Sequence, residues 1–158
     1  IALELCQEGP LDKYLNVVAS SEQDLSKEFI SKMCLGAASA LSYLESKRMV
    51  HRDVAARSIF LDSAYNPKLG RMHNARSMIV DEKKNGDVPF FSCKGEATML
   101  AVRWSAPEAL PDPWQDQVFT AKSDAWSLGC LLFEIFSRGE VPYSDLSNEM
   151  VWRATKDG

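Results

Sequence analysis

Apolar residues recur along the chain at spacings that predict a mainly helical fold with a few short strands. The longest periodic stretch, residues 26–46, places apolar side chains three and four positions apart, on one face of a helix. Residues 11–18 repeat this spacing over a shorter length, whereas residues 128–136 are apolar on nearly every side apart from Glu134. The first two stretches predict amphipathic helices, and the third predicts a helix that is buried all round.

Short apolar runs between these stretches predict strands. Residues 1–5 form an apolar run that Gly9-Pro10 follows, so we expect a buried strand that ends before this dipeptide. Residues 59–61 and 67–69 flank the turn-forming residues 62–66, and this arrangement predicts a β-hairpin. A last helix is predicted to begin after Ser147, which can cap it.

The composition is that of an ordinary globular domain. The chain has 158 residues, of which 46% are hydrophobic and 25% are charged, so it can bury a core. Its net charge of −4 lacks the basic excess that nucleic-acid-binding domains carry. The four cysteines are scattered without a C-x-x-C pair, which argues against a zinc site or a disulfide framework and fits a reducing compartment. No apolar run is long enough to span a bilayer.

One stretch carries specific chemistry, namely His51-Arg52-Asp53-Val54-Ala55-Ala56-Arg57-Ser58. A short loop of this kind can present a carboxylate to a hydroxyl nucleophile and a second ligand to a magnesium ion. H-R-D alone is a weak signal, because a solvated turn uses the same residues. Three more motifs follow it in order: V-R-W-S-A-P-E at 102–108, K-S-D-A-W-S-L-G at 122–129 and R-G-E-V-P-Y at 138–143.

These four motifs together resemble the catalytic domain of protein kinases, and most closely that of receptor-type tyrosine kinases. The resemblance implies an α+β protein-kinase-like fold, with this chain as the mostly helical C-terminal lobe, a hinge strand and a short β-hairpin. Residues 1–158 would be a partial domain, with the hinge at 1–10, the helical lobe at 11–158, the catalytic loop at 51–58 and the activation segment at 71–108. The N-terminal lobe and the last helices of the C-terminal lobe would lie outside these residues.

The resemblance also implies roles for individual residues. Asp53 would be the base for the substrate hydroxyl, and Arg57 would lie beside a substrate tyrosine. Asp124 would hold the backbone of the catalytic loop by hydrogen bonds. The nucleotide-binding positions would be Leu3 as gatekeeper, the backbone from Glu4 to Cys6 facing adenine, and Phe60 on the floor of the adenine pocket. Phe60 fits an ordinary core aromatic equally well. The structural positions would be His51, Arg52 and Glu108, and Glu108 would pair with a buried arginine past the end of this chain.

Both magnesium ligands depart from the family's pattern. Ser58 stands where asparagine is expected, and Arg71-Met72-His73 stands where Asp-Phe-Gly is expected. Two unit charges about 4 Å apart interact by roughly 4 kcal/mol at an effective dielectric constant near 20, and a divalent ion roughly doubles this, so Arg71 should repel the metal. His73 also removes the glycine that would adopt a positive φ. We therefore expect no bound magnesium, whereas ATP remains a candidate ligand.

The activation segment lacks the residue that commonly regulates it in tyrosine kinases. No tyrosine lies between Arg71 and Glu108, so phosphotyrosine cannot order this loop by pairing with basic residues such as Arg52. Residues 77–100 are polar and rich in turn formers, and we predict a mobile loop there.

Two functions remain open on these residues. The main prediction is a catalytically impaired tyrosine-kinase-like domain, a pseudokinase that acts as a scaffold or allosteric regulator in signalling. Its partners would be proteins, an active kinase or a signalling adaptor, with no nucleic acid and with membrane contact only through parts outside this chain. The alternative is an active or weakly active protein tyrosine kinase that uses Asp53 as base. Either function predicts a cytoplasmic location, which includes the intracellular part of a plasma-membrane receptor.

Overall fold

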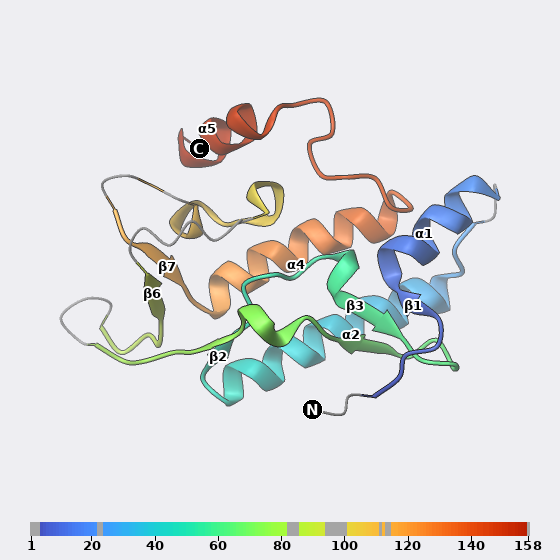
Figure 1. Ribbon diagram of the computed structural model, residues 1–158, viewed down its shortest axis with the longest axis horizontal. Coiled ribbons are helices and arrows are strands. Elements are labelled where there is room, and N and C mark those ends of the chain that lie inside the picture. Colours follow the sequence, from blue (N-terminus) through green and yellow to red (C-terminus); the bar gives the residue numbers. More distant parts are fainter. Residues whose placement is uncertain are drawn as a thin grey trace.

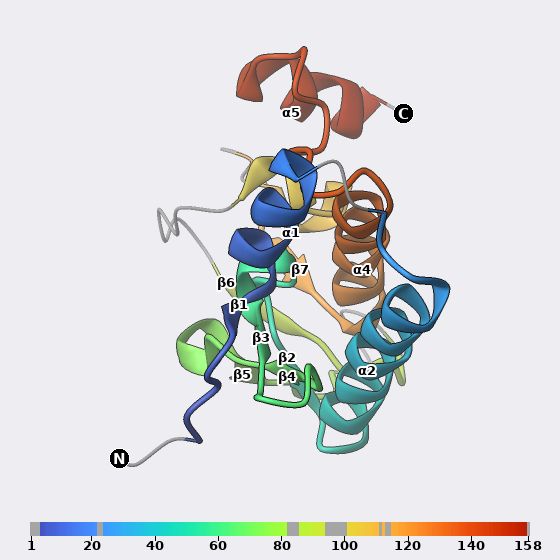
Figure 2. The same cartoon turned by 90° about the vertical axis from the view of Figure 1, so that its right-hand side faces the viewer.

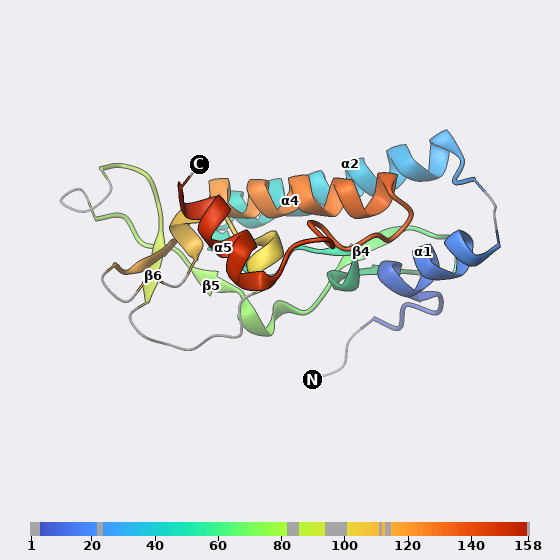
Figure 3. The ribbon, with the colours of Figure 1, turned by 90° about the horizontal axis from the view of Figure 1, so that it is seen from above.

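Two long helices, α2 (Lys27–Ser46) and α4 (Ala121–Phe136), run alongside each other through the centre of the molecule in a computed structural model (Figures 1 and 3). The structure describes residues 4–21, 24–81, 86–93, 101–110, 112 and 115–157. Helix α1 (Leu11–Ser20) lies at one end of this pair, and α5 (Asn148–Asp157) stands apart from it beyond the loop that follows α4 (Figures 1 and 2).

Local sequence chemistry explains where the two central helices begin. The Ser26 hydroxyl caps α2 by accepting a hydrogen bond from the Phe29 N–H at 3.1 Å. Thr120 and Ser123 form a reciprocal capping box at the start of α4, in which each side chain accepts a backbone N–H of that turn. These contacts satisfy donors that the first turn of a helix leaves without partners.

Small antiparallel sheets join the segments between the helices. The largest has the order β1-β3-β4, from β1 (Gly9–Pro10), β3 (Ile59–Leu61) and β4 (Pro67–Leu69), and it contains the predicted hairpin. Strand β2 (Met49–Val50) pairs with β5 (Arg76–Ser77), and β6 (Phe91–Cys93) pairs with β7 (Gln117–Phe119). Four short 3₁₀ helices lie in the described loops: η1 (Ala56–Ser58), η2 (Met72–Asn74), η3 (Val102–Trp104) and η4 (Pro107–Ala109).

The main core lies where α1, α2 and α4 meet the hairpin. Its members are apolar side chains that are almost fully buried: Leu11, Leu15, Met33, Ala37, Val54, Ala56, Ile59, Leu61, Leu131 and Ile135. A second cluster joins β2 to β7 and comprises Val50, Met78, Ala106, Ala109 and Phe119. The catalytic loop of the sequence analysis runs between these two clusters, because Val50 belongs to one and Val54 to the other.

The predicted first strand is wrong for the residues that can be compared. Glu4 and Leu5 lie in no strand, and the Leu5 side chain is 76% exposed; residues 1–3 lie outside the described chain. A strand forms instead at Gly9–Pro10, where a break was predicted. Pro10 has no N–H to donate, but β1 is an edge strand, and the Glu8 N–H supplies a bond to the Leu61 carbonyl at 3.1 Å.

The prediction that residues 128–136 are buried all round is also wrong. The side chains of Phe133 and Phe136 are 45% and 66% exposed, whereas the charged residue of the run, Glu134, is buried. The periodicity of an apolar run does not reveal which side of the helix faces the core. Here the buried side is the one that carries Glu134.

The activation segment is more ordered than predicted over part of its length. Residues Arg76–Ser77 pair with β2, the Met78 N–H donates to the Arg48 carbonyl at 2.7 Å, and Ile79 bridges Phe90. The prediction of a mobile loop is therefore wrong for these residues, since they have backbone partners elsewhere in the fold. Residues 82–85 and 94–100 lie outside the described chain. In the part that is described, no helix has the length and apolar character that a membrane crossing requires.

Two helical glycines should respond oppositely to the same substitution. A Cβ at Gly36 would clash with the Pro67 ring of β4, whereas a Cβ at Gly129 meets no atom within 4 Å. Alanine is favoured over glycine by about 1 kcal/mol inside a helix, and overpacking costs about 1–3 kcal/mol. We expect Gly129→Ala to raise the unfolding temperature and Gly36→Ala to lower it. Thermal unfolding followed by circular dichroism checks both, and stabilisation by Gly36→Ala would contradict the packing of α2 on β4.

Candidate active site around Asp53

Asp124, in the first turn of α4, holds the start of the catalytic loop. Its carboxylate accepts the backbone N–H of His51 at 2.7 Å and that of Arg52 at 3.0 Å, as the resemblance implied. Burial raises the pKa of Asp124, and these hydrogen bonds oppose the rise. A buried carboxylate on a capped helix thus fixes the backbone immediately before Asp53.

His51 extends this support to the segment that contains Arg71. The ring is fully buried, and its Nδ1 accepts the Asp53 N–H at 3.2 Å. Nε2 lies 2.7 Å from the Gly70 carbonyl oxygen, so it carries the proton and donates to that oxygen. His51 therefore connects the catalytic loop with the residue before Arg71.

The Asp53 carboxylate lies between two guanidinium groups. Arg57 Nη2 is 2.5 Å from Oδ1, and Arg71 Nε is 3.0 Å from Oδ2, so each oxygen holds one cation. The Asp53 side chain is only 9% exposed. Arg71 and Asp53 form a charge-assisted hydrogen bond, which is stronger than a bond between neutral groups. It occupies the side of the carboxylate that would otherwise face a metal ion.

Ser58 is turned away from this carboxylate. It is fully buried in η1, and its hydroxyl donates to the backbone carbonyl of Asp53 at 2.6 Å. Magnesium requires oxygen ligands in octahedral geometry. With a guanidinium at position 71 and the Ser58 hydroxyl engaged within the loop, the residues around Asp53 do not fit that ion.

The backbone at Arg71 corrects one expectation about the Arg71-Met72-His73 stretch. The positive φ falls at Arg71, at 57°, whereas His73 lies inside the 3₁₀ helix η2. Loss of glycine at position 73 therefore does not by itself prevent the left-handed turn, because the turn lies two residues earlier. The Met72 side chain is exposed.

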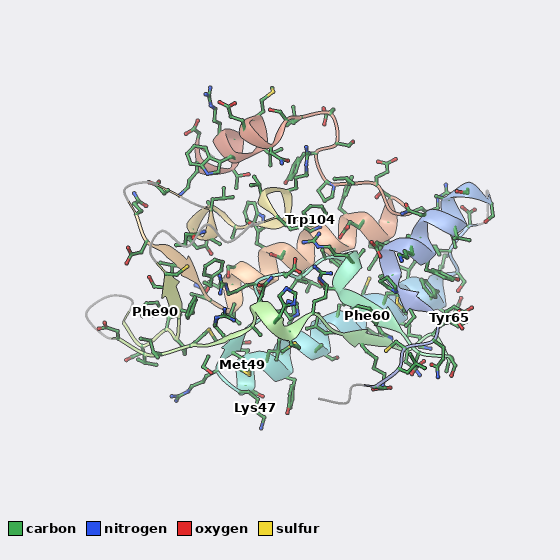
Figure 4. All side chains as sticks on the ribbon, in the orientation of Figure 1. Lys47, Met49, Phe60, Tyr65, Phe90 and Trp104 are labelled. Carbon is green, nitrogen blue, oxygen red and sulfur yellow. The ribbon has the colours of Figure 1, made fainter. Side chains whose placement is uncertain are left out.

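Arg57 is positioned from the other end of α4, by residues that sequence reasoning missed. Its guanidinium carbon lies 4.5 Å from the centre of the ring of Trp104, which Figure 4 labels beside α4. The Trp104 Nε1–H donates to Glu134 Oε2 at 2.9 Å, and the same oxygen accepts the Ala56 N–H at 2.8 Å. The one sequence signal for the role of Glu134 was that it is the single charged residue within the apolar run 128–136.

Arg52 is clamped by aromatic rings from the two paired strands β6 and β7. Its guanidinium carbon lies 4.9 Å from the Phe91 ring centre and 4.4 Å from that of Phe119. The two rings face each other across the strand pair, with centres 6.3 Å apart. We call Arg52, Phe91 and Phe119 the aromatic clamp. Through these ring contacts Arg52 connects the catalytic loop to the activation segment.

The nucleotide-binding positions are only partly described. Leu3 lies outside the described residues, and Glu4 is exposed and pairs with Lys68 at 3.2 Å. Burial and the nearby Glu4 raise the pKa of the Cys6 thiol. The Phe60 ring covers Gly70, where a Cβ would meet it at 2.7 Å, so it packs directly beside the Arg71 segment (Figure 4).

Glu108 lies exposed in η4, and no ion pair joins it to another residue of the described chain. The buried arginine that the resemblance gives as its partner is not among these residues, so the ion pair of Glu108 stays a prediction.

Comparison with known proteins identifies the family. Residues 1–158 match the family model for the protein tyrosine and serine/threonine kinase domain. The chain belongs to this kinase family. It is 34% identical to the tyrosine-protein kinase transforming protein Fps of Fujinami sarcoma virus, to the insulin receptor of Xenopus laevis and to the insulin-like growth factor 1 receptor of Bos taurus. Each alignment includes all of this chain but only 16%, 11% and 24%, respectively, of the relative's length.

These findings confirm the resemblance to tyrosine kinases and the α+β kinase-like fold. In this kinase-family chain, α4 still holds the backbone of the catalytic loop by hydrogen bonds. The residues at positions 58 and 71, in contrast, differ from the metal ligands of the family's motif.

Titration of Glu134 should make the stability of the kinase-family domain depend on pH. Burial raises the pKa of Glu134 above its ordinary 4.5, although bonds from Trp104 and Ala56 oppose this. The folded state then binds more protons than the unfolded state, so stability falls as pH rises through this range. Glu134→Gln keeps an acceptor oxygen and cannot titrate. We expect denaturation between about pH 4 and about pH 8 to show the unmodified protein losing stability relative to this variant as pH rises.

Glu134→Ala is the matched control. It leaves two buried N–H donors without an acceptor and should cost about 1–3 kcal/mol at every pH. A stability difference between the unmodified protein and Glu134→Gln that does not change with pH would contradict the raised pKa.

The aromatic clamp should keep the described parts of the activation segment ordered. Phe91→Leu retains an apolar side chain but removes a cation–π contact worth about 0.5–2 kcal/mol. We expect faster amide hydrogen exchange in residues 76–81 and 86–93, measured by mass spectrometry. Phe133→Leu, an equal change on the exposed face of α4, is the control. Unchanged exchange in the Phe91 variant would mean that strand pairing alone orders the segment.

Proposed function

We propose that this chain is the larger part of the C-terminal lobe of a tyrosine-kinase-like domain that is impaired in magnesium-dependent phosphotransfer. Its role would then be to bind proteins, as a scaffold or allosteric regulator of an active kinase or a signalling adaptor. Its place would be the cytoplasm, including the cytoplasmic side of a receptor. The hinge would lie at residues 1–10, the catalytic loop at 51–58 and the activation segment at 71–108.

The observation that carries this proposal is the pairing of Arg71 with Asp53. Phosphoryl transfer depends mainly on positioning and on neutralising charge, for which the family uses magnesium. Here the Asp53 carboxylate already holds Arg57 and Arg71, at 2.5 and 3.0 Å, and is neutralised by the protein itself. A substrate hydroxyl would have to approach a carboxylate of which both oxygens already accept a guanidinium N–H.

A second function is favoured by the relatives and by part of the geometry. The name of the Fps relative describes a tyrosine-protein kinase, and family membership brings ATP as the expected nucleotide. Asp53, Arg57 and Asp124 are all retained, with the loop backbone held by Asp124. An active or weakly active tyrosine kinase would need Arg71 to leave Asp53 when nucleotide binds. The exposed side of the Arg71 side chain permits such a movement.

A phosphotransfer assay on the full-length protein separates these two functions. We expect no phosphorylation of a tyrosine peptide above background, with or without Mg²⁺. The impaired function is refuted by a rate that rises with Mg²⁺ and collapses in Asp53→Ala.

Restoring the family's ligand residues at positions 58 and 71 should restore magnesium binding. In the double variant Ser58→Asn with Arg71→Asp, we expect magnesium affinity to rise about tenfold or more, as measured by isothermal titration calorimetry. Each single change should do much less, since the ion needs both ligands. Arg153→Asp on α5 is a charge-reversal control far from the loop in sequence, paired with Glu149 at 2.6 Å. Equal affinity in the double variant and this control would refute the account of positions 58 and 71.

A further inference from the structure

Arg71 presents unused hydrogen-bond donors beside Asp53. A guanidinium carries five N–H groups, and Arg71 uses Nε–H on Asp53 Oδ2 at 3.0 Å. Within the described residues, its two terminal nitrogens have no hydrogen-bond partner, and the side chain is 42% exposed. The edge that is free of Asp53 therefore remains available to a ligand.

Arg71 is the arginine of this site that a ligand can reach. Arg57 and Arg71 share the Asp53 carboxylate, but Arg57 also interacts with the buried Glu134. The side chain of Arg71 is 42% exposed, against 26% for Arg57. Lys68, three residues before Arg71, is already paired with Glu4 at 3.2 Å and lies 3.9 Å from Asp62.

The backbone under Arg71 is fixed before any ligand arrives. The Gly70 N–H donates to the Ser58 carbonyl at 2.8 Å, and the Gly70 carbonyl accepts from His51 Nε2 at 2.7 Å. Asp53 then restrains the side chain itself through Nε. A donor group that is already held in place loses less conformational entropy on binding than a free surface arginine does.

We propose that Arg71, held by Asp53, binds a phosphate group of a nucleoside triphosphate directly, without a divalent cation. The guanidinium edge matches phosphate oxygens in a bidentate way. Arg71 thereby takes the charge-neutralising place that the metal has in related domains. This inference rests on the proposed function in one respect, namely that the nucleotide approaches the catalytic loop as in the kinase family.

The test is ATP binding to the full-length protein, measured by calorimetry in EDTA and again in excess Mg²⁺. We expect binding in EDTA that Mg²⁺ does not strengthen. Arg71→Gln should weaken ATP and inorganic tripolyphosphate by about tenfold or more and leave adenosine unchanged. Arg71→Lys keeps the positive charge but not the forked guanidinium. Its ATP affinity should lie between that of the unmodified protein and that of Arg71→Gln. Arg153→Gln on α5 is the matched control and should bind as the unmodified protein does.

Binding that requires Mg²⁺, or equal ATP affinity in Arg71→Gln, overturns this proposal. If Arg71→Gln does not fold, the comparison of EDTA with Mg²⁺ on the unmodified protein decides the matter alone. The two proposals fail separately. Magnesium-dependent peptide phosphorylation overturns the proposed function, whereas absence of both phosphotransfer and ATP binding overturns the direct phosphate contact and leaves the impaired function standing.

Discussion

Two buried carboxylates on one helix hold the catalytic loop at both ends, and the rest of the site depends on this constraint. Asp124 accepts the N–H groups of His51 and Arg52, and Glu134 accepts that of Ala56. Ten residues of α4 separate the two acids, a rise of about 15 Å, and the loop lies across this length. Because each carboxylate loses hydration on burial, it stays in place only while the loop supplies its hydrogen bonds. The position of the loop therefore depends on the two carboxylates of α4, and the burial of these carboxylates depends on the loop.

This support explains how the ligand residues can change without loss of the fold. The Ser58 hydroxyl donates a hydrogen bond to the Asp53 carbonyl, and the Arg71 guanidinium pairs with the Asp53 carboxylate. Neither residue is needed by Asp124 or Glu134, so the scaffold and the metal ligands are separable. A change at position 71 reverses a local charge, whereas a change at position 124 would leave two backbone donors of the loop without their acceptor.

The sequence predicted those parts of the fold that local chemistry determines. Ser26 caps the helix that the apolar spacing of residues 26–46 predicted, and residues 62–66 make the expected turn between β3 and β4. The hydrogen bonds of Asp124 to the loop backbone were also expected, because the family motif gives its position. The exposed faces of Phe133 and Phe136 were not, since an apolar run does not state which neighbours it has. Glu134 and Trp104 escaped notice because their contact spans thirty residues of chain.

The aromatic clamp bears on how the activation segment can be ordered without a phosphate. In the family's pattern the arginine of H-R-D meets a phosphorylated residue of that segment, an attraction that salt screens and that a phosphatase removes. Here Arg52 lies between Phe91 and Phe119, and Phe119 belongs to the same buried cluster as Val50 of β2. Burial of apolar area does not respond to a phosphatase and is little affected by moderate salt. Order in the described part of the segment is thus built into the fold.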